Sequence, residues 1–279
     1  RFPRSKIVRI ENYNEVFSRK NQNPYLQKLS PSLIVGEKKE GFFYKGSRLC
    51  HNFEEEHFYY TNFILNCLFD CDYCYLKGMN LSSNIVFFVN LNDYFNEIAR
   101  LLNTKNKLYL SISYDSDILI FDEIYPFLNE WYNFVEKNPK ITVEIRTKSV
   151  LWKKFIKYKS LDNLILSWSL APSDIIVQYE KKTPSLEARL NAISQLLKRD
   201  WKINLALDPL IYKEFLEYLV TKIDINLINS ITVGVFRIPI NYLRRMKSFS
   251  NSPISFFPYE TVEGVASYPK DLKEEMLNY

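Results

Sequence analysis

From about residue 57 onward, the chain alternates between strand-like and helix-like segments, and this alternation constrains its fold more than any other feature. Apolar runs predict strands at residues 57–65, 85–89, 108–112, 141–145, 164–168, 203–207 and 231–235. Helix-like patterns lie between or after them, at residues 92–103, 122–137, 149–158, 185–199, 212–221 and 239–247. The helical spacing is clearest at Leu186, Leu190, Ile193 and Leu197. Such alternation favours a parallel sheet with helices packed against it.

Repeated six or seven times, this unit predicts an α/β protein, an open or partial (β/α)6-type TIM barrel. Such barrels place their active sites at the carboxyl ends of the strands. Residues 1–50 lack the alternation and are interrupted by turn signals, such as Asn23-Pro24. We therefore expect an irregular N-terminal extension over residues 1–50 and one barrel domain over residues 51–279.

Three of the four cysteines lie in one short loop directly after the first predicted strand. The loop reads Cys67-Leu-Phe-Asp-Cys71-Asp-Tyr-Cys74, a C-x3-C-x2-C spacing. Three thiolates this close can hold three irons of a four-iron cluster and leave the fourth iron open to a small ligand, which makes the cluster a reaction centre. The spacing resembles the signature of radical S-adenosylmethionine (SAM) enzymes, and the aromatic Tyr73 before the last cysteine fits it as well.

Zinc is the main alternative for this loop, with Cys50 or His51 as the fourth ligand. The chain would then be a zinc-stabilised nucleic-acid-binding protein without catalysis. Zinc ligands usually come as two separated pairs rather than as a compact trio, so the spacing favours iron–sulfur. Two disulfides are less favoured, because no signal peptide is visible and a chain of 279 residues does not need them.

The overall composition excludes few classes of protein. The formal net charge is +5 and the pI is near 8.8, which is compatible with nucleic-acid binding but not diagnostic of it. No apolar run approaches the roughly 20 residues needed to span a membrane, so we expect no membrane partner. Clustered reduced thiols and the lack of a visible export signal predict a cytoplasmic location.

Several segments beyond the cysteine triad resemble the spore photoproduct lyase family. Residues 66–79 resemble the cluster loop of that family, with the sequence Asn66-Cys-Leu-Phe-Asp-Cys-Asp-Tyr-Cys-Tyr-Leu-Lys-Gly-Met79. Later segments with the same resemblance are residues 113–118, 144–149, 167–172, 207–209 and 234–239. The resemblance covers nearly the whole chain, from about residue 1 to residue 270.

The resemblance implies a partial TIM barrel, a [4Fe–4S] cluster and SAM as cofactors. It also implies a reaction, the cleavage of the methylene bridge that joins two thymines in UV-damaged spore DNA by way of a 5′-deoxyadenosyl radical. The expected partners are UV-damaged DNA and a reductant of the flavodoxin or ferredoxin type. A lesion inside a duplex must be pulled out of the base stack, and a damaged base lowers the cost of doing so.

The same resemblance assigns expected roles to individual residues. Cys67, Cys71 and Cys74 match the cluster ligands, whereas Ser116, Lys148 and Ser169 fall on positions that resemble SAM contacts. A lysine can pair with the SAM carboxylate, and hydroxyls can bond its polar groups. The alternative for each of these three is a solvated loop residue or a helix cap.

The tyrosines beside the cluster loop are expected to act in hydrogen transfer. Tyr73 and Tyr75 flank Cys74, where the family is thought to use tyrosines in its hydrogen relay, although packing around the cluster is an alternative. Tyr114 stands where the family usually has its hydrogen-donating cysteine. A phenol is a slower hydrogen donor than a thiol, so either Tyr114 or a neighbouring tyrosine replaces the cysteine, or the enzyme acts on a different substrate.

A late group of basic residues is the candidate for DNA contact. Arg237, Arg244, Arg245 and Lys247 cluster near the last predicted barrel strand and the helix after it. Cationic side chains at this position could bind phosphates. The alternative is that they form a solvated helix face.

Overall fold

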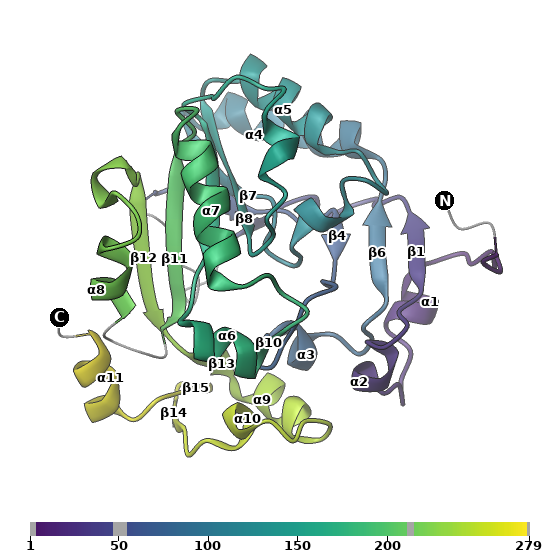
Figure 1. Cartoon of the computed structure of the whole chain (residues 1–279). Helices are drawn as coiled ribbons and strands as arrows, with labels where there is room; N and C mark the ends of the chain where they lie inside the picture. Colours follow the sequence, from purple (N-terminus) through teal and green to yellow (C-terminus); the bar gives the residue numbers. More distant parts are fainter. Residues whose placement is uncertain (1–3, 47–54, 211–214, 278–279) are drawn as a thin grey trace.

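A curled sheet of seven strands forms the centre of the computed structural model, which describes residues 4–46, 55–210 and 215–277 (Figure 1). The strand order is β12-β11-β9-β8-β7-β3-β2. The first six strands in this order are mutually parallel, whereas β2 is antiparallel to β3. The bounds are β2 (Tyr44–Lys45), β3 (Phe58–Tyr60), β7 (Leu108–Ser111), β8 (Ile141–Thr147), β9 (Leu164–Ser169), β11 (Ile203–Leu210) and β12 (Ser230–Val235). The prediction of a partial barrel with six parallel strands is therefore confirmed.

Helices follow the strands and cover the sheet, as the alternation predicts. They are α4 (Leu91–Thr104), η1 (Ile118–Phe121), α5 (Leu128–Lys137), η2 (Trp152–Phe155), α6 (Ser173–Tyr179), α7 (Leu186–Leu197), α8 (Phe215–Val220) and η3 (Ile225–Leu227). Helix α7 begins at the N-cap Ser185, whose side chain accepts a hydrogen bond from the backbone of Ala188. Trp131 and Trp168 are fully buried in the core beneath these helices. The expected helix over 149–158 is only the short 3-10 turn η2.

One predicted barrel strand lies outside the main sheet. Strand β6 (Ile85–Phe88) is the centre of a separate three-stranded sheet with β1 (Leu33–Gly36) and β4 (Ile64–Leu65). The expected strand over 57–65 divides into β3 and β4, and β3 pairs directly with β7, which leaves no place for β6 between them. The prediction that this apolar run belongs to the barrel was therefore wrong.

Residues 4–46 contain little regular structure but contribute one strand to the main sheet and one to the sheet of β6. They supply α1 (Asn14–Phe17) and α2 (Pro24–Gln27), each a single turn, together with β1 and β2. Strand β1 is parallel to β6 along its whole length. The expected boundary between residues 50 and 51 lies outside the described residues.

The C-terminal segment forms a small layer at the end of the sheet toward which β11 and β12 point (Figure 1). It consists of β13 (Arg237–Pro239), α9 (Ile240–Lys247), α10 (Pro253–Phe256), β14 (Glu260–Val262), β15 (Val265–Ser267) and α11 (Lys270–Leu277). Strands β13, β15 and β14 form an antiparallel sheet around the buried residues Ile238 and Ala266. The sequence predicted only α9 of these elements. None of the described helices is both long enough and apolar enough to cross a lipid bilayer.

Close contact between α9 and α3 (Leu76–Met79) joins this layer to the cysteine loop. Arg245 Nη1 donates hydrogen bonds to the carbonyl oxygens of Gly78 and Met79, each at 2.8 Å. A side chain at Gly78 would collide with the backbone of Tyr242, so the two helices can approach this closely only because residue 78 is a glycine. The C-terminal layer therefore supports the helix that begins just after Cys74.

Candidate active site

A cavity of about 540 Å³ opens at the carboxyl ends of the parallel strands. Its lining includes residues at or just beyond the ends of successive strands, namely Tyr60 after β3, Ser113 after β7, Lys148 after β8, Ser169 at the end of β9 and Asp208 within β11. This is the edge at which barrel enzymes carry their active sites, so the fold and the cavity agree on where chemistry takes place.

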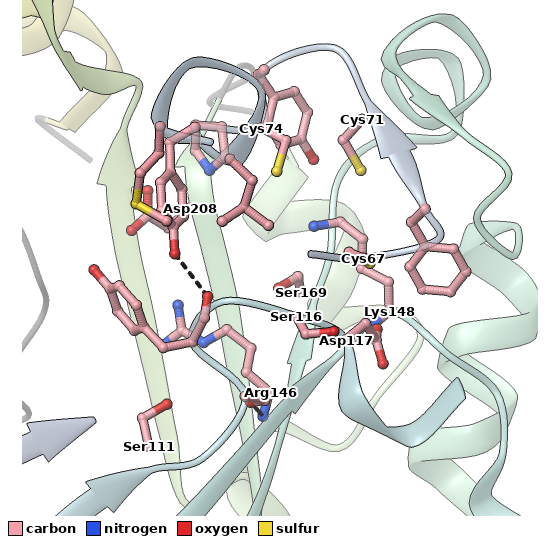
Figure 2. Close-up of a pocket in the computed structure, with 18 of the residues that line it drawn as sticks. Cys67, Cys71, Cys74, Ser111, Ser116, Asp117, Arg146, Lys148, Ser169 and Asp208 are labelled. Carbon is pink, nitrogen blue, oxygen red and sulfur yellow. Dashed lines mark hydrogen bonds between the residues drawn. The ribbon is translucent and has the colours of Figure 1, made fainter. Parts of the chain in front are cut away.

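All three cysteines of the loop line one end of this cavity (Figure 2). The loop is held in place by β5 (Asp70–Cys71), which pairs with β10 (Glu180–Lys181), so that Cys71 lies opposite Glu180. A further backbone bond of 2.7 Å runs from Asp72 N to Tyr179 O. The cysteines therefore sit on a segment fixed to the far side of the barrel.

All three thiols are free, and burial desolvates those of Cys67 and Cys71. Burial raises the pKa of Cys67 to about 12, and burial also raises the pKa of Cys71. Thiols of this kind give up their protons to a metal centre rather than to water. Across the described ranges, no three His, Cys, Asp or Glu side chains converge on one point closely enough to hold a single ion. The three free thiols at one end of the cavity are a donor set that fits three irons of a four-iron cluster. Cys50 and His51, the expected fourth ligands of the zinc alternative, lie outside the described residues.

Ser116, Lys148 and Ser169, the three expected SAM contacts, gather beneath the cysteines in Figure 2 and line the same cavity. Ser116 Oγ donates a hydrogen bond of 2.7 Å to the carbonyl of Asn66, directly before the first cysteine. The backbone N–H of Lys148 donates to the buried Asp117 carboxylate at 2.6 Å. Residues at or beyond the ends of three different strands are thereby brought to one place.

A buried carboxylate, Glu180, links these contacts to the cysteine loop. It accepts hydrogen bonds from Tyr73 Oη and Arg189 Nη2, and its Oε1 lies 3.8 Å from Lys148 Nζ. Burial acts to raise the pKa of Glu180, but Lys148 and Arg189 outweigh it, so the pKa is lowered and the group is charged. Burial likewise acts to lower the pKa of Lys148, and Glu180 and Cys71 raise it above its ordinary value.

Arg189 completes this buried network from α7 and is itself fully buried. Its guanidinium donates to the carbonyl oxygen of Ser169 at 2.9 Å and to Thr183 Oγ1 at 2.7 Å, and its Nε donates to the carbonyl oxygen of Pro184 at 3.1 Å. One cation therefore fixes both the end of β9 and the carboxylate that holds Tyr73 and Lys148. The sequence analysis missed Glu180 and Arg189, since nothing in the sequence marks either residue as a partner of a loop more than a hundred positions away.

The three candidate catalytic tyrosines all line the cavity, but they form two groups. Tyr73 faces Glu180, whereas Tyr75 Oη donates to the carbonyl oxygen of Tyr114 at 2.8 Å and to Asp115 Oδ1 at 3.0 Å. The ring of Tyr114 is stacked on Tyr60 with centroids 4.5 Å apart, and lies 6.0 Å from the ring of Tyr75. Tyr75 and Tyr114 are therefore adjacent, and Tyr73 belongs to the cofactor end.

The four basic residues expected to contact DNA do not form one patch. Arg237 lines the cavity, where it makes a two-pronged ion pair with Asp208 at 3.1 and 3.0 Å. Arg245 donates hydrogen bonds to carbonyl oxygens of α3, whereas Arg244 and Lys247 are exposed on α9.

Arg146 is a second cavity-lining arginine that the sequence analysis did not single out. It lies toward the end of the cavity away from the cysteines, near Ser111 (Figure 2). Its Nη2 is 3.3 Å from Oε1 of the buried Glu144. The sequence did hold a signal for Arg146, because it lies in residues 144–149, a segment that resembles the spore photoproduct lyase family and includes the end of β8.

A partial parallel barrel with three cysteines of C-x3-C-x2-C spacing at its carboxyl edge defines the radical SAM class of enzyme. A family model described as spore photoproduct lyase matches residues 47–235, more than half of the chain. The chain belongs to the spore photoproduct lyase family. No curated protein was found to match it.

Several solved structures share the fold. A spore photoproduct lyase mutant with dinucleoside spore photoproduct has a TM-score of 0.74 at 18% sequence identity, covering 88% of this chain and 76% of that one. A double mutant of spore photoproduct lyase with bound AdoMet and dinucleoside spore photoproduct has a TM-score of 0.73 at 17% identity, with the same coverage. At such low identities, the similarity establishes the fold of this chain.

Proposed function

We propose that this protein is a radical SAM carbon–carbon lyase that reverses the methylene-bridged thymine dimer of UV-damaged DNA. The observation that carries the proposal is the convergence of Cys67, Cys71 and Cys74 with Ser116, Lys148 and Ser169 in one cavity of a chain from this family. A [4Fe–4S] cluster on the three thiolates, with SAM at its open iron, would supply a 5′-deoxyadenosyl radical. Related structures that contain AdoMet and dinucleoside spore photoproduct support this pairing of cofactor and substrate.

The chain's own residues bind and orient the reactants. Lys148 presents its ammonium group to the SAM carboxylate, and the hydroxyls of Ser116 and Ser169 bond the polar groups of SAM. Glu180 holds Lys148 charged and in place. The apolar parts of the cavity wall exclude water and other hydrogen donors from the radical chemistry. Because the site needs reduced thiols, we propose a reducing compartment, the cytoplasm.

The decisive experiment is anaerobic turnover. The protein is reconstituted with iron and sulfide, reduced with dithionite, and incubated with SAM and dinucleoside spore photoproduct. Release of the repaired dithymidine together with 5′-deoxyadenosine is the expected result. Formation of 5′-deoxyadenosine without repair would favour the second candidate, a radical SAM enzyme of this family with a different substrate. That candidate is motivated by Tyr114, which stands where the family has a cysteine.

Tyr114→Phe is expected to slow repair by about 100-fold, the lower end of the typical contribution of a positioned proton-transfer group. We propose that the Tyr114 hydroxyl returns a hydrogen atom to the product radical, and Phe removes only that hydroxyl while keeping the ring stacked on Tyr60. The measurement is the repair rate together with the fraction of product diverted to side products. Tyr44→Phe is the matched control, because Tyr44 also stacks on Tyr60 but does not line the cavity. An unchanged rate and product spectrum in Tyr114→Phe would remove this residue from the mechanism.

Arg244→Ala is expected to weaken binding to damaged duplex DNA and to reduce the salt slope of log K by about 1, as for the loss of one phosphate contact. Arg244 is exposed on α9, the helix that also contributes Tyr242 to the cavity wall, so we propose that a DNA strand entering the cavity passes over it. Fluorescence anisotropy over a range of salt concentrations measures the slope. Arg100→Ala, an exposed arginine on α4, is the control. Equal slopes for the two variants would place DNA elsewhere.

A further inference from the structure

The cysteine loop has an outer side that the proposed repair chemistry does not use. Leu68, next to Cys67, is 38% exposed, although the neighbouring cysteines line the cavity. The chain just after α2 lies against this side, because Lys28 Nζ donates a hydrogen bond to the carbonyl oxygen of Cys67. The backbone that would carry the cluster therefore reaches the protein surface at Leu68.

An excess of positive charge surrounds this side of the loop. Lys77 pairs with Asp70 at 2.8 Å, and Lys181 pairs with Asp72 at 3.3 Å. Two further lysines, Lys28 and Lys182, lie nearby, and within the described ranges neither has a carboxylate at ion-pair distance. They are linked through the backbone instead, since Lys182 Nζ donates to the carbonyl oxygen of Lys28 at 3.2 Å.

Exposed leucines lie among these lysines. Leu26 is 66% exposed and Leu29 is 77% exposed, and they flank Lys28 in the chain. Leu68 joins them through the contact of Lys28 with Cys67. We call this surface the loop patch, and it consists of Leu26, Lys28, Leu29, Leu68, Lys181 and Lys182. Exposed leucines interspersed with lysines are suited to a small, electrostatically steered interface.

We propose that the loop patch is the docking surface for a small acidic one-electron carrier protein that reduces the cluster. The inference rests on the proposed function, since it requires an iron–sulfur centre on the three cysteines. One electron leaves the carrier, which is oxidised, and enters the cluster, which is reduced, without proton transfer. Damaged DNA would occupy the mouth of the cavity, so the carrier must approach from another side, and the loop patch lies directly over Cys67. Complexes of this kind are small and depend on complementary charge.

Charge reversal on the patch tests the proposal. Lys182→Glu is expected to weaken the binding of flavodoxin, an acidic one-electron carrier, on the order of tenfold and to flatten its salt dependence. Lys182 is exposed, and within the described part of the chain its ammonium group bonds only to a backbone carbonyl, so the variant should keep its structure. Leu29→Ser tests the apolar part without a change of charge. Lys137→Glu is the matched control, because Lys137 is exposed at the end of α5, just before β8 begins, and thus at the edge of the sheet away from the cavity.

Two readouts separate this proposal from the proposed function. The first is the dissociation constant of flavodoxin, measured by titration without turnover. The second is the rate of 5′-deoxyadenosine formation with reduced flavodoxin and, separately, with dithionite, which needs no docking surface. We expect Lys182→Glu to slow only the flavodoxin-driven reaction. If both patch variants bind flavodoxin as tightly as Lys137→Glu does, the loop patch is not the docking surface. If dithionite yields no 5′-deoxyadenosine with the unaltered protein, the proposed function fails. The titration still shows whether flavodoxin binds at the loop patch.

Discussion

Cys71→Ala is expected to abolish reductive SAM cleavage, with a loss of at least 1,000-fold, on the order of the acceleration that an essential catalytic centre provides. Among the described residues, three thiols line the cavity and Cys71 is one of them, so an alanine there leaves two, too few to hold three irons of a cluster. Iron and sulfide content, the visible absorption of the reconstituted protein and 5′-deoxyadenosine formation are the measurements.

Cys50→Ala is the matched control for this result. Iron–sulfur ligation by the loop alone predicts that Cys50→Ala retains iron, sulfide and SAM cleavage. The zinc alternative, in which Cys50 or His51 closes a tetrahedral site, predicts instead that purified protein binds one zinc ion. Retained SAM cleavage in Cys71→Ala would refute both enzymatic hypotheses, the repair lyase and the radical SAM enzyme with a different substrate.

Arg189→Met is expected to destabilise the protein by about 3–5 kcal/mol, the usual cost of removing one partner from a buried ion pair. Arg189 and Glu180 are both buried, and the guanidinium also satisfies the carbonyl oxygen of Ser169. Without it, the Glu180 carboxylate keeps Lys148, 3.8 Å away, as its remaining cation. Urea unfolding of the wild type and the variant measures the change in the free energy of unfolding.

The double variant Glu180→Gln/Arg189→Met separates a lost interaction from a charge left without its partner. We expect it to be less destabilised than the sum of the two single variants, since the buried carboxylate is removed together with its counter-ion. Additive effects would show that the two groups are energetically independent and would contradict the network. Arg199→Met is a surface control. Arg199 is exposed, donates to the carbonyl oxygen of Gln195 and lies 5.4 Å from the ring centroid of Trp152, so we expect its loss to change stability by no more than about 1 kcal/mol.

The sequence predicted the barrel well because its strands are short apolar runs separated by helices, and parallel pairing requires this order. It failed at residues 85–88 for a physical reason. All four side chains of β6 are buried, so the run has no polar alternation to indicate which sheet it joins. Its partner β1 comes from residues 33–36, where a run of only four residues among turn signals gave no strong strand signal.

The candidate site was predictable only where chemistry and chain order coincide. The cysteines are marked by their spacing, and Lys148 by its place just beyond a strand that enters the cavity. Glu180 and Arg189 are marked by neither. Glu180 reaches the site because β10 pairs with the cysteine loop, and a two-residue strand leaves no periodic pattern in a sequence. Arg189 is a charged residue on the buried side of α7, a position at which a helical pattern predicts an apolar side chain.

The position of β6 between β1 and β4 affects which recombinant fragments of this chain can fold. The family model begins at residue 47, but a recombinant fragment that starts there would lack β1. The fragment would expose the unpaired backbone of Ile85–Phe88, an apolar edge of the kind that recruits other chains and causes aggregation. The short N-terminal strand therefore covers an apolar edge, and we expect a fragment without it to aggregate when it is expressed.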